Sequence, residues 1–161
     1  MNHSLSSTDN SVMLPRKLIF FINPISGTAN KQKLEKVIHA SMQANAIEYS
    51  IQHTKKDGNY EEEKMQAIQT SVTDIIICGG DGTINSIARY FVNTNIRIGI
   101  IPMGSGNGLA YALGIPKNIH KAIDIIVEGK SAPIDSFQVN NHFACMLSGI
   151  GLDATIAHRF A

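Results

Sequence analysis

The sequence has little of what marks several large classes of protein. Lysine and arginine number 14 against 13 aspartate and glutamate, so the net charge is +1 and we expect no nucleic-acid partner. Tryptophan is absent, and the two cysteines and six histidines form no Cys-x-x-Cys or His-x-x-x-His pair, which disfavours a zinc site. Cys78 and Cys145 lie inside apolar runs, and we expect both to be buried core residues.

Long apolar stretches are also missing. No run approaches the ~20 residues that a membrane-spanning helix needs. Residues 1–14 are rich in serine and asparagine and have neither an apolar core nor an early positive charge, so they resemble neither a signal peptide nor an anchor. We expect this segment to be a disordered polar head. At 161 residues and 43% hydrophobic content, the rest of the chain is long enough to bury one sizeable core.

The chain does contain apolar strand runs that end in glycine-rich polar loops. The most informative is Ile75–Cys78, which stops at Gly79-Gly80-Asp81-Gly82-Thr83. Glycines let backbone N–H groups approach an anion closely, and the helix expected next presents its positive end to the same charge. The pattern therefore predicts a phosphate site in which Asp81 faces a magnesium ion. A tight turn with an N-capping Asp or Thr is the alternative.

The same pattern occurs at two other places. The run 17–22 ends in Asn23-Pro24-Ile25-Ser26-Gly27-Thr28, and the run 97–102 ends in Met103-Gly104-Ser105-Gly106-Asn107-Gly108. In a parallel sheet the carboxyl ends of all strands lie at one edge, where open α/β sheets bind ligands. We therefore expect the three loops to converge on one crevice. For the first loop, an ordinary Asn-Pro turn that caps a helix is the alternative.

The order of the elements predicts a layered α/β/α fold with a mostly parallel sheet. Apolar spacing alternates between strand and helix up to residue 134, which is typical of parallel strands with helices on both faces. The predicted strands are 17–22, 47–51, 74–78 and 97–101, and the predicted helices are 32–40, 60–68, 83–92, 107–114 and 117–128. From Pro133 onward, two strand-like runs flank Asn140-Asn141, which indicates an antiparallel hairpin and the start of a different unit.

Three motifs, in this order, carry a resemblance to a known family. They are Asn23-Pro24-x-Ser26-Gly27, Gly79-Gly80-Asp81-Gly82-Thr83 and Pro102-x-Gly104-Ser105-Gly106-Asn107. Together they resemble the catalytic domain of the diacylglycerol kinase and sphingosine kinase family. Ala132-Pro133-Ile134-Asp135 and Gly149-Ile150-Gly151-Leu152-Asp153-Ala154 fit the same pattern, so the resemblance extends from about Lys17 to the end of the chain.

The resemblance implies an enzyme that transfers the γ-phosphoryl group of ATP, with Mg²⁺, to a hydroxyl of diacylglycerol or a sphingoid-type lipid. It also implies a cytoplasmic protein that works at the periphery of the membrane. Residues 15–134 would be the nucleotide-binding α/β domain, and residues 135–161 the first strands of a lipid-binding all-β domain. Family members are considerably longer, so we expect that second domain to be truncated here and the 161-residue chain alone to be inactive.

The resemblance also assigns roles to individual residues. Asp81 is expected to be catalytic, and Asp81 and Asp135 are expected to contact the metal, although Asp135 at the end of a strand has a capping role as its alternative. The residues expected to contact the nucleotide are Asn23, Ser26, Gly27, Thr28, Gly79, Gly80, Gly82, Thr83, Gly104, Ser105, Gly106 and Asn107.

Two positions depart from the family pattern. Gly108 stands where relatives have an aspartate of the metal network, and Ser86 stands where many have a glutamate. The segment Gly104–Ala110 is more similar to the form found in sphingosine and ceramide kinases, which favours a sphingoid or unusual lipid slightly.

Other functions stay open at this point. NAD kinase and phosphofructokinase share the Gly-Gly-Asp-Gly motif, and a non-catalytic nucleotide-binding module is compatible with the departure at Ser86. A dinucleotide enzyme is disfavoured, because Asp124, about 20 residues after Gly104, falls inside a predicted helix and the third glycine of the fingerprint is missing. The unpaired edges of the predicted hairpin favour self-association, and we expect a homodimer.

Overall fold

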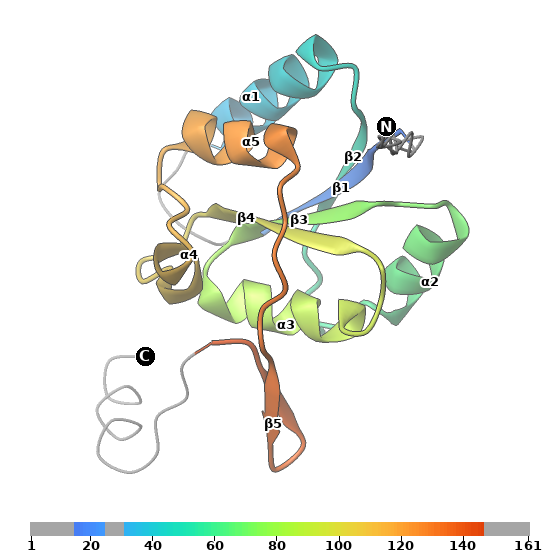
Figure 1. Cartoon of the computed structure of the whole chain (residues 1–161), viewed down its shortest axis with the longest axis vertical. Helices are drawn as coiled ribbons and strands as arrows, with labels where there is room; N and C mark the ends of the chain where they lie inside the picture. The colour runs from blue at the N-terminus through green and yellow to red at the C-terminus, as the bar shows by residue number, and fades with distance from the viewer. Residues whose placement is uncertain (1–14, 25–30, 147–161) are drawn as a thin grey trace, which may run out of the picture.

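The computed structural model describes residues 15–24 and 31–146, which form a layered α/β/α fold with a small hairpin beside it (Figure 1). The predicted polar head, the loop residues Ser26, Gly27 and Thr28, and the motif Gly149–Ala154 lie outside the described residues. No helix in the described part is long and apolar enough to cross a membrane.

A four-stranded parallel sheet forms the middle layer, in the order β2-β1-β3-β4. Its strands are β1 (Lys17–Ile22), β2 (Glu48–His53), β3 (Asp74–Gly79) and β4 (Arg97–Pro102). The central strand β3 is a continuous apolar run because both of its faces are covered, and it is buried along its whole length. The predicted parallel sheet is confirmed, and each strand begins and ends within two residues of the expected bounds.

Helices cover both faces of the sheet (Figure 1). α1 (Lys31–Ala44) and α5 (Ile119–Glu128) lie on one face, and α2 (Glu61–Gln69) and α3 (Asp81–Phe91) lie on the other. α4 (Gly108–Ala112) is a short helix that follows β4. The predicted three layers are therefore confirmed.

The alternation of side chains along the strands divides the core into two layers. Phe20 packs among the buried residues of α1 and α5, whereas its neighbour Phe21 packs among those of α2 and α3. The predicted burial of the cysteines is confirmed, with Cys78 in the first layer and Cys145 in the second. Burial raises the pKa of both thiols, so they stay protonated near neutral pH.

A buried charge cluster closes the amino-terminal edge of the sheet. Asp74, at the start of β3, is 4% exposed and forms ion pairs with Arg16 at 3.0 Å and with Arg97 at 2.9 Å. Both guanidinium groups also reach the carboxyl end of α5. Arg16 Nη1 donates to the carbonyl of Ile126 at 2.7 Å, and Arg97 Nη1 donates to the carbonyl of Gly129 at 3.0 Å. Asp74 therefore ties three strands to α5, with both cations at the negative end of that helix.

Beyond α5 the chain leaves the layered body and forms a two-stranded antiparallel hairpin (Figure 1). Its strands are β5 (Phe137–Val139) and β6 (His142–Ala144), which pair residue by residue from Val139 and His142 outward. Asn140 and Asn141 both take positive φ at the turn, the conformation that a two-residue hairpin loop requires. The hairpin predicted from the Asn-Asn pair is confirmed.

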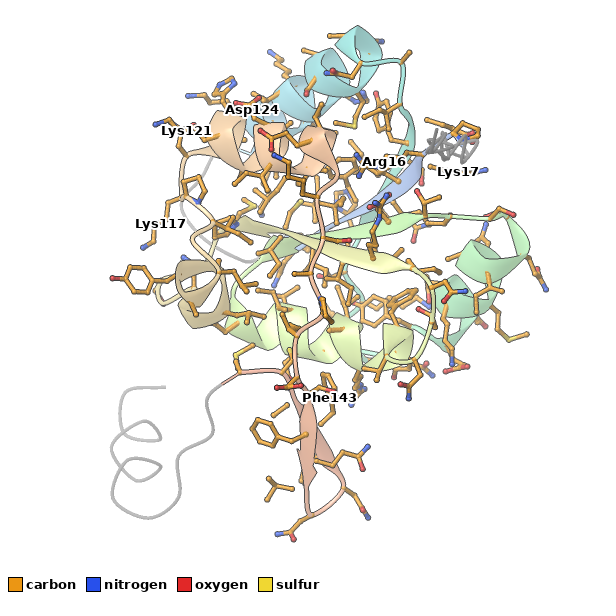
Figure 2. The ribbon with its side chains drawn as sticks, in the orientation of Figure 1. Arg16, Lys17, Lys117, Lys121, Asp124 and Phe143 are labelled. Atoms are coloured by element: carbon orange, nitrogen blue, oxygen red, sulfur yellow. The ribbon has the colours of Figure 1, made fainter. Side chains whose placement is uncertain are left out.

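The hairpin is attached to the body through α3. Asn85 Nδ2 donates to the carbonyl of Phe143 at 2.9 Å, and the Phe143 side chain packs against the core layer under α3 (Figure 2). Phe137 and Val139 on β5 are each 42% exposed. Self-association through these residues stays a prediction.

We expect Asp74→Asn to lower the free energy of unfolding at pH 7 by about 3 kcal/mol, because it removes the charge that two part-buried arginines share. Burial by itself raises the pKa of Asp74, but hydrogen bonds from Arg16, Thr73 and Arg97 outweigh it and hold the pKa below its usual value. The stabilisation is therefore present above the unfolded-state pKa of about 3.9 and is lost as the pH falls through the lower folded-state pKa. Urea unfolding of both proteins across this pH range measures the loss.

Glu48→Gln is the matched control for this variant. Glu48 pairs with Lys17 at 2.8 Å near the same edge of the sheet, but its side chain is 67% exposed, so we expect a loss below about 1 kcal/mol. Equal losses for the two variants at pH 7 would contradict the role given to the Asp74 cluster.

Candidate functional site

The carboxyl ends of β1, β3 and β4 bring the three predicted loops to one edge of the sheet. β1 and β3 are neighbours, yet the chain leaves them toward opposite sides of the sheet, through α1 to β2 and through α3 to β4. Such a reversal of strand order is the position at which open α/β sheets bind ligands. The described parts of the three loops meet there.

Asn23 joins the first loop to the second. Its backbone N–H donates to the carbonyl of Cys78 at 3.1 Å, and its side-chain Nδ2 donates to Thr83 Oγ1 at 2.8 Å. Two residues that were predicted from separate motifs to bind phosphate are thus hydrogen-bonded to each other. The Thr83 hydroxyl accepts in this bond and keeps its own proton to donate to another acceptor.

The second loop delivers the positive end of α3. This helix begins at Asp81, two residues earlier than predicted, and Gly80 is its N-cap residue, with no side chain to satisfy the first N–H groups. A side chain at Gly82 would meet no atom within 4 Å, so this residue faces open space. The amino terminus of α3 is therefore accessible to an anion.

The second and third loops touch through backbone atoms. A Cβ atom on Gly104 would lie 2.6 Å from the Cα atom of Gly80, and a Cβ atom on Gly80 would lie 3.1 Å from the Cα atom of Gly104. The N–H of Met103 donates to the carbonyl of Gly79 at 2.9 Å, which continues the ladder of β3 and β4 up to this contact. Both glycines are needed for the loops to approach so closely.

Asn107 shapes the third loop from inside. It is 2% exposed and has a φ of 56°, in the left-handed region that asparagine tolerates better than most residues. Its Oδ1 accepts the N–H of Gly104 at 2.7 Å, and its Nδ2 donates to the carbonyl of Gly104 at 2.6 Å. The amide of Asn107 therefore closes the loop, and Ser105 and Gly106 are the residues exposed at its tip.

Asp81 reaches from the second loop to the third. Its Oδ2 accepts the N–H of Gly108 at 2.9 Å, and its Oδ1 accepts the N–H of Leu109 at 3.2 Å. The sequence left open a metal ligand or an N-cap, and the structure shows a cap of an unexpected kind, because Asp81 begins α3 but caps α4. A carboxylate offers about four acceptor positions, so about two remain for a cation or water.

Gly108 lies beside the carboxylate that forms this cap. A Cβ atom at position 108 would lie 3.8 Å from Asp81 Oδ2 and 3.9 Å from Oδ1, an ordinary contact distance. An aspartate here, which the family resemblance leads one to expect, would begin next to the Asp81 carboxylate. In this chain glycine leaves that position without a second carboxylate, and Asp81 accepts backbone N–H groups there.

Asp135, the second predicted metal contact, is exposed in the segment between α5 and β5 and forms no hydrogen bond or ion pair with the described residues. In residues 15–24 and 31–146, no three His, Cys, Asp or Glu side chains gather into a group that holds a metal ion. Neither the metal contact of Asp135 nor its capping role is tested by this arrangement, and both stay predictions.

A groove of about 820 Å³ begins beside the second loop and follows α3 to the hairpin. Gly82 and Ser86 contribute to the α3 wall, and Phe137 and His142 contribute to the hairpin wall. Ser86, which departs from the family pattern, therefore lies at an accessible surface next to the loops. The groove shares Gly82 with the site but extends away from the first and third loops.

One contact with the third loop had no signal in the sequence. Lys117 was predicted only as the start of a helix, yet its Nζ lies 3.4 Å from the carbonyl of Ser105. In Figure 2 it lies at the same end of the molecule as α4. No spacing rule links a lysine to a glycine loop that precedes it by a helix and a turn.

Comparisons with known proteins agree with this arrangement. The family model described as the diacylglycerol kinase catalytic domain matches residues 17–139. The chain is 33% identical over 139 residues to a diacylglycerol kinase of Staphylococcus carnosus, covering 85% of this chain and 45% of that one. It is 36% identical over 133 residues to a diacylglycerol kinase of Bacillus subtilis, covering 80% and 44%. A crystal structure described as a diacylglycerol kinase from Bacillus anthracis superimposes with a TM-score of 0.69 at 26% identity, covering 80% and 45%.

The chain spans less than half the length of these relatives. The matched range nevertheless includes the three loops, Asp81, Asp135 and the first hairpin strand. Because the family model matches most of the sequence, the chain belongs to the diacylglycerol kinase catalytic domain family.

Proposed function

We propose that this chain is the nucleotide-binding part of an ATP-dependent lipid kinase. One observation carries the proposal: the three loops are locked together at the reversal of strand order, by the bond from Asn23 to Thr83 and by the contact between Gly80 and Gly104. A rigid set of backbone donors at this position suits the phosphates of a nucleotide.

The phosphates would bind at the exposed parts of the loops. The uncapped start of α3, with Gly82 open to solvent, offers N–H groups and the positive end of the helix dipole. The Thr83 hydroxyl has a proton to donate, and Ser105 and Gly106 expose the tip of the third loop to the same edge. Ser26, Gly27 and Thr28, which lie outside the described residues, are proposed to contribute from the first loop.

Asp81 fits a magnesium site. Mg²⁺ takes oxygen ligands, keeps several waters and needs only one or two carboxylates besides substrate phosphates, and Asp81 has acceptor positions left after its two bonds to α4. When bound, the ion would neutralise charge on the phosphates during transfer. Asp135 is proposed as a further ligand in the longer protein.

In the proposed mechanism, Asp81 would hold and orient the magnesium ion and would not take a proton. Its carboxylate is fixed by the N–H groups of Gly108 and Leu109, so its remaining lone pairs have one direction relative to the third loop. Catalysis of phosphoryl transfer consists almost entirely of such positioning and of charge stabilisation. We propose that the proton of the lipid hydroxyl goes to a carboxylate supplied by another part of the longer protein.

The acceptor is proposed to be diacylglycerol, the substrate in the names of the relatives, rather than a soluble molecule such as NAD. The form of the segment Gly104–Ala110 supports a sphingoid-type lipid as the competing acceptor. A non-catalytic nucleotide-binding module is the second candidate function, because Gly108 leaves Asp81 without the neighbouring carboxylate that the family pattern includes.

Calorimetric titration of the chain with ATP, with and without Mg²⁺, tests the proposal, with NAD as the control titrant. We expect magnesium-dependent binding of ATP and none of NAD. A version extended through the second domain should then phosphorylate diacylglycerol or a sphingoid lipid in vesicles. Binding of ATP without turnover by the extended version would favour the non-catalytic module.

We expect Asp81→Asn to remove the magnesium dependence of ATP binding and to lower kcat of the extended version by about 10² to 10³-fold, since one charge-stabilising group is lost. The variant should still fold, because the amide oxygen of Asn can accept one of the two N–H groups of α4. Asp124→Asn, on the exposed side of α5, is the control and should leave both measurements unchanged. An Asp81→Asn variant with wild-type activity would remove Asp81 from the mechanism.

We expect Gly104→Ala to abolish measurable ATP binding and to lower stability by about 1–3 kcal/mol, because the added Cβ would push against the backbone of Gly80 at 2.6 Å. Gly82→Ala is the matched control for stability, since its Cβ would meet nothing within 4 Å. Thermal melting and ATP titration of both variants measure the difference. A Gly104→Ala protein with unchanged melting and binding would show that the loops need no close contact.

The end of the molecule that carries α4 is proposed to face the membrane. Tyr111 is 87% exposed and Leu113 is 46% exposed, and both lie just after the third loop. Exposed aromatic and aliphatic side chains are typical of surfaces that insert into the lipid headgroup region. This placement would bring the phosphate loops to the bilayer, where a lipid hydroxyl is presented.

We expect the double variant Tyr111→Ser with Leu113→Ser to bind vesicles of phosphatidylglycerol and phosphatidylcholine at least about fivefold more weakly in sedimentation assays, since it removes the apolar area that enters the headgroup region. The double variant Met65→Ser with Ile68→Ser is the matched control, because these α2 residues are similarly exposed at another part of the molecule. Equal binding by the Tyr111 and Leu113 variant and the wild type would contradict the proposed orientation.

A further inference from the structure

Lys117 is held at both ends by the fold. It follows Pro116, and before that the N–H of Ile115 donates to the carbonyl of Ala110 at 2.8 Å, which ties the segment to α4. It precedes Asn118, whose side chain caps α5 by accepting the N–H of Lys121 at 3.2 Å. The backbone of Lys117 is therefore fixed between two helices.

The Lys117 side chain lies against the third loop but is weakly engaged there. Its Nζ donates to the carbonyl of Ser105 over a long 3.4 Å, and the residue is exposed. In the described part of the chain it forms no ion pair with an acidic side chain. An ammonium group with three protons and one neutral acceptor is suited to take an anionic acceptor in its place.

The loops themselves contain no positive side chain. The segments 23–28, 79–83 and 103–108 have neither lysine nor arginine, so their phosphate contacts depend on backbone groups, amides and hydroxyls. A bound triphosphate carries several negative charges, and sites that transfer a phosphoryl group place a cation against them. The carbonyl of Ser105 marks the loop tip at which Lys117 reaches that region.

We propose that Lys117 binds the phosphate chain of the nucleotide, leaving the Ser105 carbonyl and donating to a phosphate oxygen. The inference rests on the proposed nucleotide site and adds its cationic contact. The exchange replaces a long bond to a neutral acceptor by a charge-assisted bond to an anion, without any change in the backbone. The contact requires phosphates beyond the first, because the attraction between a cation at the loop tip and the nucleotide grows with the total negative charge of its phosphates.

Calorimetric titration with ATP, ADP and AMP, all with Mg²⁺, tests the proposal on the 161-residue chain. We expect Lys117→Ala to weaken ATP binding about tenfold and AMP binding less than twofold, with ADP between them. Lys117→Arg should restore most of the ATP affinity. The ratio of wild-type to Lys117→Ala affinity should fall at about 0.5 M salt, because screening weakens an exposed charge contact.

Lys121→Ala is the matched control. Lys121 is exposed on α5, and its backbone N–H bonds to Asn118 near the same turn, but its side chain forms no hydrogen bond with the described residues. It should bind ATP as the wild type does. Equal weakening by both alanine variants, equal weakening of ATP and AMP, or wild-type ATP binding by Lys117→Ala would each overturn the assignment. A wild-type chain that binds no ATP at all would overturn the proposed function as well, whereas the other outcomes leave that function standing.

Discussion

The candidate site depends on the close contact between Gly80 and Gly104. At this point the second and third loops meet through backbone atoms. The distance allows Asp81 to reach the N–H groups of α4, and it brings the exposed start of α3 beside the exposed tip at Ser105 and Gly106. Larger residues at positions 80 and 104 would separate the helix from the loop that it faces.

Charged and polar groups are paired at one edge of the sheet and exposed at the other. At the amino-terminal edge, Asp74 is buried and fully paired, and its arginines satisfy the last carbonyl groups of α5. At the carboxyl edge, the start of α3 has no capping side chain, and among the described residues the Lys117 ammonium group contacts only the carbonyl of Ser105, over a long 3.4 Å. A satisfied cluster holds the layers together, and an unsatisfied edge is available to an anion. This contrast supports placing the ligand at the carboxyl edge.

The fold was largely predictable because its signals are local. The apolar run in β3, the 3.6-residue spacing of Leu34 and Ile38 in α1, and the Asn-Asn turn each depend on a few neighbouring residues. The glycine motifs also predicted that three strand ends would meet at one edge, and the described parts of the loops do meet there. The roles of particular side chains were less predictable. Asp81 bonds to residues 27 and 28 positions later, and this pairing exists only once the sheet has formed.

Asn107 and Lys117 both show that a sequence motif does not decide what a side chain contacts. The motif predicted a nucleotide contact for Asn107, and its side-chain amide forms two hydrogen bonds within its own loop, while the nucleotide contact stays a prediction. Lys117 had no motif, yet its side chain reaches the loop tip because Pro116 and the cap of α5 fix its backbone. Residue type and spacing therefore predicted that the loops converge, whereas the direction of each side chain depended on backbone conformation and on partners distant in sequence.

The most direct test of the phosphate site is an NMR titration of the ¹⁵N-labelled chain with ATP and Mg²⁺, for which a mass of 17.5 kDa is suitable. The account predicts that the amide signals of Gly82, Thr83, Ser105 and Gly106 shift first and most, while those of Asp74 and Arg97 at the opposite edge stay in place. Large shifts at the amino-terminal edge, or along α2, with unchanged signals from the glycine loops would contradict it.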